Sequence, residues 1–409
     1  MDTKYRMFIV DDDQHYIDIQ ATLLEAAGHT VSSETRSVDA LPKILEEQPD
    51  CVLIDIMMPE MDGLQLTREI RSKDRSRKMK IVVVSAKPYE YDKKRALEFG
   101  ADGFITKPID MDSYLPKIEK LIEDRIVMTF WGVRGTLPVP GAKALKYGGN
   151  TSCLTLEFPR GEFFIFDAGT GIKALSDHIG EKGPARLDAK IFISHPHWDH
   201  INALPFFAPL YVQGNEFEIL GPAHGDVTTR ELISAQMDSV YFPINIREFA
   251  ASVQFTDLGE GSLRFGDIGI DAMLLSHPGN CLGYRIEYNE RSICYITDNE
   301  LFPPESPAFN PRYLASLTKF VHRCDALITD TTYSDSEYKR KVNWGHSPIS
   351  PVVALAHEAE VKTLYLFHHD PDQSDEDIDS KLETADRLLT NLRSSTRCVA
   401  PTEKELYEI

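Results

Sequence analysis

The segment KIFISHPHWDH, residues 190–200, joins an apolar strand-like run to three histidines and one aspartate. Alternation along an extended chain points the rings of His195 and His197 to the same side. Asp199 and His200 then turn toward a neighbouring position, so the segment can reach two metal ions. Imidazole and carboxylate ligands together suit Zn²⁺, with Mn²⁺ or iron as competitors. The segment therefore predicts a two-metal site at the end of a buried strand.

Further side chains that can bind metal follow apolar runs later in the chain. His277 follows IDAMLLS, Asp298 follows SICYIT, and the pair His368 and His369 follows TLYLF. Each residue stands just beyond a strand-like run, where the functional groups of α/β folds collect. We expect these residues to complete the metal site. The spacing favours His368 over His369, and the choice between them is left open.

Residues 4–125 alternate between strand-like apolar runs and amphipathic helical stretches. The predicted strands are MFIV (7–10), CVLI (51–54), KIVVVS (80–85) and GFIT (103–106), with a weaker one near HTVSSE (29–34). Continuous apolar strands between helices indicate a parallel sheet covered on both faces, here a five-stranded doubly wound α/β domain. From residue 127 onward, short β-like runs predict a layered α/β body with two sheets; these runs are TSCLTLEF, GEFFIFD, KIFISH, FEILGP, IDAMLLSH, LGYRIEY, SICYITD, DALITD and TLYLFHH. We expect domains at residues 1–125 and 126–409, joined by a short junction.

Polar side chains also stand at the ends of the predicted strands in the first domain. Asp11 and Asp12 follow MFIV, Asp55 follows CVLI, Ser85 ends KIVVVS, and Lys107 follows FIT. Three carboxylates at one sheet edge suit a hard, oxygen-preferring cation such as Mg²⁺. A lysine beside them can hold a phosphoryl oxygen or pair with an aspartate. The pattern therefore predicts a magnesium-dependent phosphorylation site.

The segments VDDD, IDIMMPEMDG, VSA and TKP resemble the receiver domain of two-component response regulators, over about the first 125 residues. The resemblance implies a flavodoxin-like fold, Asp55 as the phosphoacceptor and a sensor histidine kinase as partner. It implies a magnesium site made by Asp11, Asp12, Asp55 and the backbone carbonyl of Met57. It also implies three residues that respond to the phosphoryl group, namely Ser85, Phe104 and Lys107.

The metal-capable residues, together with Asp167 in FIFDAGTG, resemble the metallo-β-lactamase fold, an αββα sandwich, over roughly residues 127–409. The resemblance implies that Asp298 bridges two metals and that Asp167 orients a ligand without binding metal itself. The other ligands it implies are His195, His197 and His277 for one metal, and Asp199, His200 and His368 for the second. His197 stands where oxygen-reducing diiron members carry a glutamate, which favours hydrolysis over redox chemistry.

The strings HPGNCLGY, TDN and NWGHSP resemble the ribonuclease Z-like phosphodiesterases within this fold. The resemblance implies that His346 assists at the scissile phosphate and that Asp330 positions it. In a two-metal hydrolysis we also expect Asp199 to accept or orient the proton of the attacking water while it serves as a ligand. The chain has no Gly/Pro- and Lys-rich arm of the kind that grips tRNA between its HPHWDH and HPGN segments. Aspartate also replaces the family's glutamate at position 330. A small substrate therefore fits this chain better than folded RNA.

The net charge of −20 disfavours long nucleic acid as a partner, because an acidic field repels polyanions. No run approaches the roughly 18 consecutive apolar residues that a membrane span needs. The start, MDTKYRMFIVDDD, lacks the basic and apolar segments of a secretory signal. We therefore expect a cytoplasmic protein with no membrane partner, and the sequence leaves a homodimer open.

Together these features predict a response regulator whose output is a binuclear metal-dependent phosphodiesterase, controlled by phosphorylation of Asp55. The expected substrate is a small phosphodiester such as a cyclic nucleotide or a short oligonucleotide. One alternative is hydrolysis of a carboxylic ester, thioester or lactone by the same metal core, against which the Gly-His346-Ser element argues. The other is a signalling adaptor that binds a metal-coordinated ligand without turnover.

Overall fold

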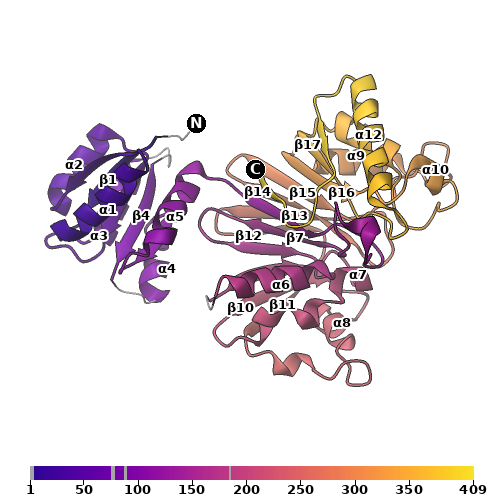
Figure 1. Ribbon diagram of the computed structural model, residues 1–409, viewed down its shortest axis with the longest axis horizontal. Helices are drawn as coiled ribbons and strands as arrows, with labels where there is room; N and C mark the ends of the chain where they lie inside the picture. The colour runs from indigo at the N-terminus through magenta and orange to yellow at the C-terminus, as the bar shows by residue number, and fades with distance from the viewer. Residues whose placement is uncertain (1–3, 75–78, 87–89, 184–185) are drawn as a thin grey trace. The chain divides into compact units, whose positions relative to one another are not determined.

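The computed structural model describes residues 4–74, 79–86, 90–183 and 186–409 (Figure 1). The chain forms two compact units. The first comprises residues 1–125 and 158–161, and the second comprises residues 126–157 and 162–409. Among the described residues, no helix combines the length and the apolar character that crossing a bilayer requires.

The described part of the first unit is a parallel five-stranded sheet with strand order β2-β1-β3-β4-β5. Its strands are β1 (Arg6–Val10), β2 (Thr30–Glu34), β3 (Cys51–Asp55), β4 (Lys80–Ser85) and β5 (Gly103–Thr106). Its helices are α1 (Gln14–Ala26), α2 (Ser37–Glu47), α3 (Gly63–Lys73), α4 (Glu90–Glu98) and α5 (Met111–Glu123). This arrangement confirms the predicted flavodoxin-like, doubly wound domain.

Both faces of this sheet are covered, as its continuous apolar strands predict. Every residue of β3 and β4 is buried. Ile17 on α1 and Ile118 on α5 belong to one apolar cluster, while Ile44 on α2 and Leu66 on α3 belong to another. Because the strands are parallel, their carboxyl ends meet at one edge of the sheet. That edge carries the predicted phosphorylation site.

The described part of the second unit contains two seven-stranded sheets. In spatial order, the first sheet consists of β11 (Ser252–Leu258), β10 (Glu216–Pro222), β9 (Asp188–Phe192), β8 (Phe163–Phe166), β7 (Cys153–Glu157), β6 (Val127–Gly132) and β19 (Leu406–Glu408). The second consists of β12 (Gly261–Phe265), β13 (Ile268–Leu274), β14 (Leu282–Tyr288), β15 (Arg291–Ile296), β16 (Ala326–Asp330), β17 (Thr363–Phe367) and β18 (Arg397–Val399). Both sheets mix parallel and antiparallel pairs.

Helices cover the outer faces of the two sheets (Figure 1). On the first sheet lie α6 (Gly171–Glu181) and α8 (Thr229–Ala235), and on the second lie α9 (Pro311–Phe320), α11 (Ile349–Glu358) and α12 (Asp375–Asn391). Ile172 and Leu175 of α6 pack in one cluster with Ile165 of β8 and Ile191 of β9. Two single-turn helices, α7 (Trp198–Ile201) and α10 (Asp335–Tyr338), stand in connecting loops.

Aromatic side chains fill the space between the two sheets. The ring centroids of Phe166 on β8 and Tyr295 on β15 are 5.5 Å apart, as are those of Phe192 on β9 and Tyr284 on β14. Such rings bury large apolar areas in tilted or edge-on contacts. The resulting order of helix, sheet, sheet and helix confirms the predicted αββα sandwich.

Five strands of the second unit were not among the predicted runs. Strands β18 and β19 have three residues each, too few for a recognisable pattern. Strands β11 and β12 carry mostly exposed or half-buried positions, so their composition resembles that of a loop. Strand β6 is apolar and largely buried, but it follows α5 after only a short junction. The sheets therefore extend further at their edges than the apolar runs predict.

Candidate metal centre and phosphorylation site

Strand ends of both sheets deliver the metal-capable side chains of the second unit to one place. His195 and His197 stand in the loop after β9, and Asp199 and His200 lie in α7. His277 follows β13, Asp298 follows β15 and His368 follows β17. The ligand atoms of these residues fall into two groups, each within 4.8 Å. The structure thus brings together all seven residues predicted as metal ligands.

The first ligand group consists of His195, His197 and His277. The Nδ1 atom of His197 lies 2.8 Å from Nε2 of His195 and 3.1 Å from Nε2 of His277. The Oδ2 atom of Asp298 lies 3.6 Å from Nε2 of both His195 and His277. Three ring nitrogens and one carboxylate oxygen therefore converge on a single point.

The second ligand group consists of Asp199, His200 and His368. The Nε2 atom of His368 lies 3.1 Å from Oδ2 of Asp199 and 3.3 Å from Nε2 of His200. The Oδ1 atom of Asp298 lies 3.1 Å from Nε2 of both His200 and His368. Asp298 thus turns one oxygen to each group, which is the arrangement expected of a bridging ligand.

Hydrogen bonds at the far side of two rings fix which nitrogens carry lone pairs. His277 Nδ1 donates to the carbonyl oxygen of Gly345 at 2.8 Å, and His200 Nδ1 donates to Oδ2 of Asp167 at 2.7 Å. In the neutral tautomer, the Nε2 atoms of both rings then present lone pairs toward the oxygens of Asp298. Lone pairs that face carboxylate oxygens need a cation between them. The donor set therefore fits two divalent metal ions.

The charges of the centre point the same way. Burial lowers the pKa values of His195, His197 and His277, which keeps their rings neutral and able to bind metal. Burial alone lowers the pKa of His200 as well, but the neighbouring carboxylates of Asp199 and Asp298 raise it overall. The carboxylates thus favour a positive charge at the second ligand group, which a proton or a metal ion can supply.

Asp167 orients the second ligand group from behind. Its side chain is fully buried and accepts hydrogen bonds from the backbone N–H and the hydroxyl of Ser194, at 2.7 and 2.8 Å, and from the hydroxyl of Tyr295 at 2.7 Å. Its fourth partner is His200. Asp167 has a φ of 59°, in the left-handed region that costs energy for a non-glycine residue. Asp167 therefore contacts His200 from outside the two ligand groups, and its role in orienting a ligand stays a prediction.

His346 and Asp330 form a pair beside the two groups. His346 Nδ1 lies 2.8 Å from Oδ2 of Asp330, whose other oxygen accepts from the backbone N–H of Thr332 at 2.9 Å and from its hydroxyl at 2.6 Å. The His346 ring stacks on His368, with ring centroids 4.9 Å apart. Burial alone lowers the pKa of His346, but Asp330 and its hydrogen bond raise it to about 9. His346 is thus held by a buried carboxylate at the edge of the centre.

The doublet His368-His369 divides into two roles. His368 faces Asp199 and Asp298, whereas His369 turns away and accepts a hydrogen bond at Nδ1 from Lys381 at 2.9 Å. The backbone of His368 has a φ of 60°. Its ring packs closely against Gly135, because a Cβ added to Gly135 would lie 2.1 Å from Cε1 of His368. The position of His368 agrees with the choice made by spacing, and its role as a ligand stays a prediction.

In the first unit, the predicted phosphorylation residues meet at the carboxyl edge of the sheet. Lys107 Nζ lies 2.8 Å from Oδ2 of Asp11 and 2.7 Å from Oδ1 of Asp55. The Tyr16 ring lies beneath the same ammonium group, 4.1 Å away. Burial raises the pKa of Asp11, while hydrogen bonds to Asp11 and Asp55 raise the pKa of Lys107 against the effect of burial. The carboxylates of Asp11 and Asp55 therefore favour the protonated, positively charged form of Lys107 at this edge.

The other predicted receiver residues lie around this pair. Asp12 is exposed next to Asp11, Ser85 is buried at the end of β4, and Phe104 is half-buried on β5. The backbone N–H of Met57 donates to Oδ2 of Asp55, and its side chain is exposed. The structure thus gathers the predicted residues at one edge, and their roles stay predictions.

Several residues that organise the metal centre were not predicted. The backbone N–H of Thr136 donates to Oδ2 of Asp199 at 2.6 Å. Glu300 is buried and accepts from the backbone N–H groups of Asn343 and Gly345, both at 2.7 Å. Ser194, which donates two hydrogen bonds to Asp167, directly precedes the HPHWDH segment. Among these unpredicted residues, it is the one that stands next to this motif. The others act through backbone groups or through partners distant in the sequence, so no local pattern marks them.

Residues 163–369, just over half the chain, match the family model described as the beta-lactamase superfamily domain. The chain belongs to the beta-lactamase superfamily. Residues 7–119 match the response regulator receiver domain. The resemblances to a receiver domain and to the metallo-β-lactamase fold are thereby confirmed: this superfamily member carries a receiver domain ahead of its metallo-β-lactamase-fold hydrolase domain.

One solved structure agrees with this assignment at the level of the fold, and two others are similar to parts of the chain. This superfamily member is similar to the metallo-beta-lactamase fold protein YhfI from Bacillus subtilis, at 17% identity over 70% of this chain and 100% of that chain, with a TM-score of 0.50. A diphosphatase from the PhnP family is 16% identical over 69% of this chain and 98% of that one, with a TM-score of 0.49. A CheY-like receiver domain protein from Methanospirillum hungatei JF-1 is 29% identical over 30% of this chain and 95% of that one, with a TM-score of 0.28. The fold and the buried cluster of His and Asp side chains support a metal-dependent hydrolase, and the receiver domain indicates a sensor kinase as partner.

Proposed function

We propose that residues 126–409 hydrolyse a small phosphodiester, such as a cyclic nucleotide or a short oligonucleotide, with two divalent metal ions. Zinc is the favoured metal because the proposed ligands are mostly imidazole, with Mn²⁺ and iron as the alternatives. The observation that carries the proposal is the pair of His346 and Asp330 beside the two ligand groups. An acyl hydrolase of the same metal core has no evident use for a histidine anchored in this way.

The side chains of the centre have distinct parts in the proposed reaction. His195, His197 and His277 would hold one ion, and Asp199, His200 and His368 the other, with Asp298 between them. Two bound ions would lower the pKa of a water molecule and neutralise charge on the phosphate oxygens. Asp199, fixed by the N–H of Thr136, would accept or orient the proton of the attacking water. His346 would stabilise the phosphate or protonate the leaving oxygen, a contribution typically worth about 10²–10⁴-fold in rate.

Two exposed tryptophans support a substrate with a nucleobase. Trp198 stands between His197 and Asp199 with 80% of its surface exposed, and Trp344 precedes Gly345 with 62% exposed. A large exposed aromatic ring next to a catalytic centre suits stacking of a base, which is worth about 1–3 kcal/mol.

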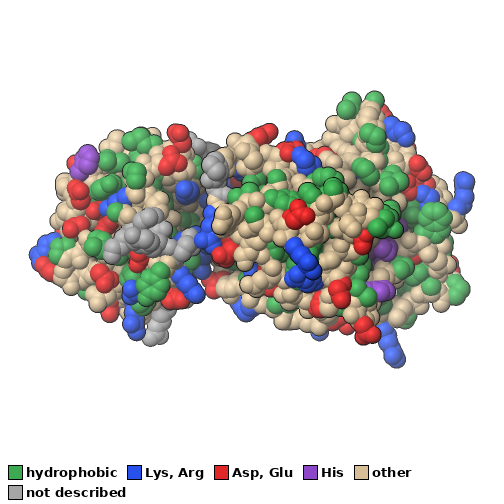
Figure 2. Space-filling model, turned by 90° about the horizontal axis from the view of Figure 1, so that it is seen from below, with side chains coloured by type: hydrophobic (Ala, Val, Ile, Leu, Met, Phe, Trp, Pro, Cys, Tyr) green, Lys and Arg blue, Asp and Glu red, His purple; other side chains and the backbone are tan. Residues whose placement is uncertain are grey.

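The charge distribution supports a small substrate over long nucleic acid. The chain has a net charge of −20. On the face drawn in Figure 2, Lys and Arg side chains lie scattered among Asp and Glu side chains and do not gather into one stripe. Polyanions bind through clustered basic side chains that displace counterions. A short phosphodiester held by metal ions requires no such surface.

We further propose that phosphorylation of Asp55 controls this activity. Lys107 ties Asp55 to Asp11 in the unmodified domain. A phosphoryl group on Asp55 would take over Lys107 and bind Mg²⁺ with Asp11, Asp12 and the Met57 carbonyl. Ser85 and Phe104 would then change position in response to the phosphoryl group. Their movement would carry the local change to the surface of the domain. A sensor histidine kinase would supply the phosphoryl group.

A substrate screen with zinc-loaded full-length protein tests the proposal. The substrates are bis-p-nitrophenyl phosphate, cyclic nucleotides, short RNA and a lactone, and His197→Ala is the control. We expect turnover of phosphodiesters and its loss in the control. Turnover of the lactone alone would overturn the phosphodiesterase in favour of an acyl hydrolase. If the metal-loaded protein turns over none of the substrates, this result would support the alternative of a signalling adaptor that binds a metal-coordinated ligand without turnover.

A further inference from the structure

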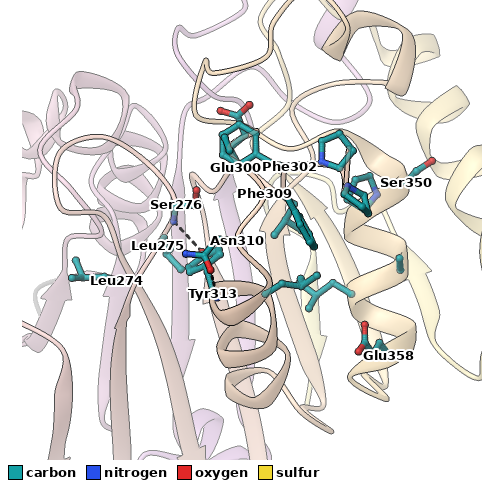
Figure 3. Close-up of a pocket in the computed structure, with 18 residues that line it drawn as sticks. Leu274, Leu275, Ser276, Glu300, Phe302, Phe309, Asn310, Tyr313, Ser350 and Glu358 are labelled. Carbon is teal, nitrogen blue, oxygen red and sulfur yellow. Dashed lines mark hydrogen bonds between the residues drawn. The ribbon is translucent and has the colours of Figure 1, made fainter. Parts of the chain in front are cut away.

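A cavity of about 560 Å³ lies in the second unit, next to the metal centre but lined by different residues. Its walls come from the end of β13 and the residues after it, the segment between β15 and α9, the first turn of α9, and one side of α11. Figure 3 shows Ser276 and Tyr313 on one side of the cavity and Ser350 and Glu358 on the other. Most of the lining is apolar, with Leu275, Leu301, Phe302, Phe309, Leu314 and Leu355 as its large side chains. The volume lies within the roughly 300–1,000 Å³ typical of small-molecule sites.

The wall of this cavity is built before any ligand arrives. The Tyr313 hydroxyl donates to Oδ1 of Asn299 and accepts from the backbone N–H of Ser276 at 3.0 Å. Glu300 accepts from Tyr338 at 2.7 Å and, at the same distance, from the backbone N–H of Gly345. The Tyr313 hydroxyl and the Glu300 carboxylate are therefore paired with protein partners. A ligand would not have to satisfy them, and it would meet mainly carbon atoms.

The charge of the wall sets the chemistry of the ligand. None of the described residues that line the cavity is Lys, Arg or His, whereas two are glutamates, Glu300 and Glu358. Burial raises the pKa of Tyr313, so its hydroxyl stays neutral. An anion in the cavity would meet carboxylates with no compensating cation, and this disfavours the phosphate group of the proposed substrate. A neutral molecule with a large apolar surface meets no such penalty.

The hydrogen bonds of the wall lead directly to the metal centre. Ser276, which Tyr313 holds, immediately precedes His277. Gly345, which Glu300 holds, accepts at its carbonyl from His277 Nδ1 at 2.8 Å. Both hydrogen-bonded connections thus end at His277, one of the proposed metal ligands. Groups in one hydrogen-bonded network are energetically coupled, so a ligand that shifts the wall acts on the orientation of the His277 ring.

We propose that this cavity binds a neutral, predominantly apolar small molecule at a site separate from the metal centre. The site does not depend on the proposed phosphodiesterase activity, because its walls share no side chain with the two ligand groups. Its geometry makes it an effector site that adjoins the centre through His277.

A matched pair of fluorophores tests the charge argument. N-phenyl-1-naphthylamine is neutral, and 8-anilino-1-naphthalenesulfonate is the same skeleton with a sulfonate. Both are titrated into zinc-loaded full-length protein. Ala354 lines the cavity from the exposed side of α11, so Ala354→Trp fills it without disturbing a buried contact. Ala235→Trp, at an exposed position on α8 outside the cavity, is the control.

We expect saturable binding of the neutral probe to the wild type and to the Ala235→Trp control. Ala354→Trp should weaken that binding at least tenfold, and the sulfonate should bind at least tenfold more weakly than the neutral probe. Unchanged circular dichroism of both variants shows that they are folded. Equal affinity of wild type and Ala354→Trp for the neutral probe would overturn the site. Equal affinity of the two probes at a site that Ala354→Trp blocks would overturn the neutral ligand. Because binding is read by fluorescence, the result stands whether or not phosphodiesters are hydrolysed.

Discussion

Oδ2 of Asp330 lies 2.8 Å from Nδ1 of His346, although the two residues belong to separate segments on either side of α10. Asp330 ends β16 and is fully buried. The same oxygen also accepts from the backbone N–H of Asn299 at 3.1 Å. Two donors thus converge on one carboxylate oxygen, which fixes the His346 ring.

The substitution Asp330→Asn should lower kcat and leave the bound metal in place. The amide carries no charge to hold the His346 ring, and in either orientation its NH2 group would face a backbone N–H donor, that of Asn299 or that of Thr332. His346 would then lose its orientation, and we expect kcat for a phosphodiester to fall by about 100-fold or more. Steady-state kinetics and metal content by mass spectrometry measure the two effects separately.

The control for this prediction is Asp325→Asn, just before the start of the same strand. Asp325 accepts from the backbone N–H of Ser292 at 2.7 Å and pairs with Lys362, away from the ligand groups. Its kcat should remain that of the wild type. Loss of metal from Asp330→Asn in proportion to the loss of activity would contradict a positioning role and assign Asp330 to metal binding.

A buried lysine predicts a pH dependence of stability. Lys381 on α12 is 3% exposed and donates to the carbonyl oxygen of Thr331 at 2.7 Å. Burial lowers the pKa of Lys381 to about 7. The unfolded chain, with an ordinary lysine, binds more protons than the folded protein above that pH. Stability therefore rises with pH in this window, by about 2 kcal/mol between pH 7 and pH 9.

The difference between wild type and Lys381→Met isolates this contribution. The free energy of unfolding of the wild type, relative to that of the variant, should increase from pH 7 to pH 9. Urea denaturation followed by tryptophan fluorescence reports the second unit alone, because the three tryptophans are Trp131, Trp198 and Trp344. Lys362→Met, which removes an exposed lysine, should show no such change with pH. A difference for Lys381→Met that stays constant with pH would contradict a lowered pKa.

Phosphorylation of Asp55 can be tested on the intact chain. Incubation with acetyl phosphate and Mg²⁺ should add one phosphoryl group to the wild type, seen by intact mass, and none to Asp55→Asn. Asp50→Asn is the matched control, because Asp50 lies just before β3 and Asp55 ends it. The control should be modified like the wild type. Turnover by the phosphorylated protein should differ from that of the unmodified protein, and identical rates would refute the proposed regulation.

The sequence predicted most of what depends on strand ends. Because parallel strands end at one edge of the sheet, Asp11, Asp55 and Lys107 meet there whatever the conformation of the loops. Their order along the chain was therefore sufficient to predict that they would meet. The metal ligands likewise follow apolar runs. The hydrogen bonds that orient the metal ligands were not predictable, because they join residues that are far apart in the sequence and that no local motif marks. Tyr295 and Asp167, for example, are 128 positions apart.

The cavity was not predicted for a related physical reason. Its walls come from separate parts of the chain that meet only after the second sheet and its helices have packed. No motif within any one of these parts marks a binding site. Only the structure shows that the Glu300 carboxylate and the Tyr313 hydroxyl are paired with protein partners.

Removal of the exposed ring of Trp344 should weaken binding of nucleotide substrates. Loss of one stacked base is worth about 1–3 kcal/mol, so Trp344→Ala should raise KM for a cyclic nucleotide by about tenfold. The value of kcat should change little, because Trp344 is not among the proposed ligands. Leu392→Ala, which truncates an exposed apolar side chain at the end of α12, should leave KM unchanged. An equal KM for Trp344→Ala and wild type would refute base stacking at this residue.

The close approach of Gly345 to His277 makes a prediction about metal affinity. Gly345 has a φ of +88°, and an added Cβ would lie 2.5 Å from Nδ1 of His277. Gly345→Ala therefore strains the backbone and pushes the ring away from the carbonyl that fixes its tautomer. We expect zinc affinity to fall at least about tenfold, measured by competition with a chelating dye. Gly180→Ala, on α6 with open space around its Cβ position, should keep wild-type affinity. Unchanged zinc binding in Gly345→Ala would show that the bond from His277 to Gly345 does not orient a metal ligand.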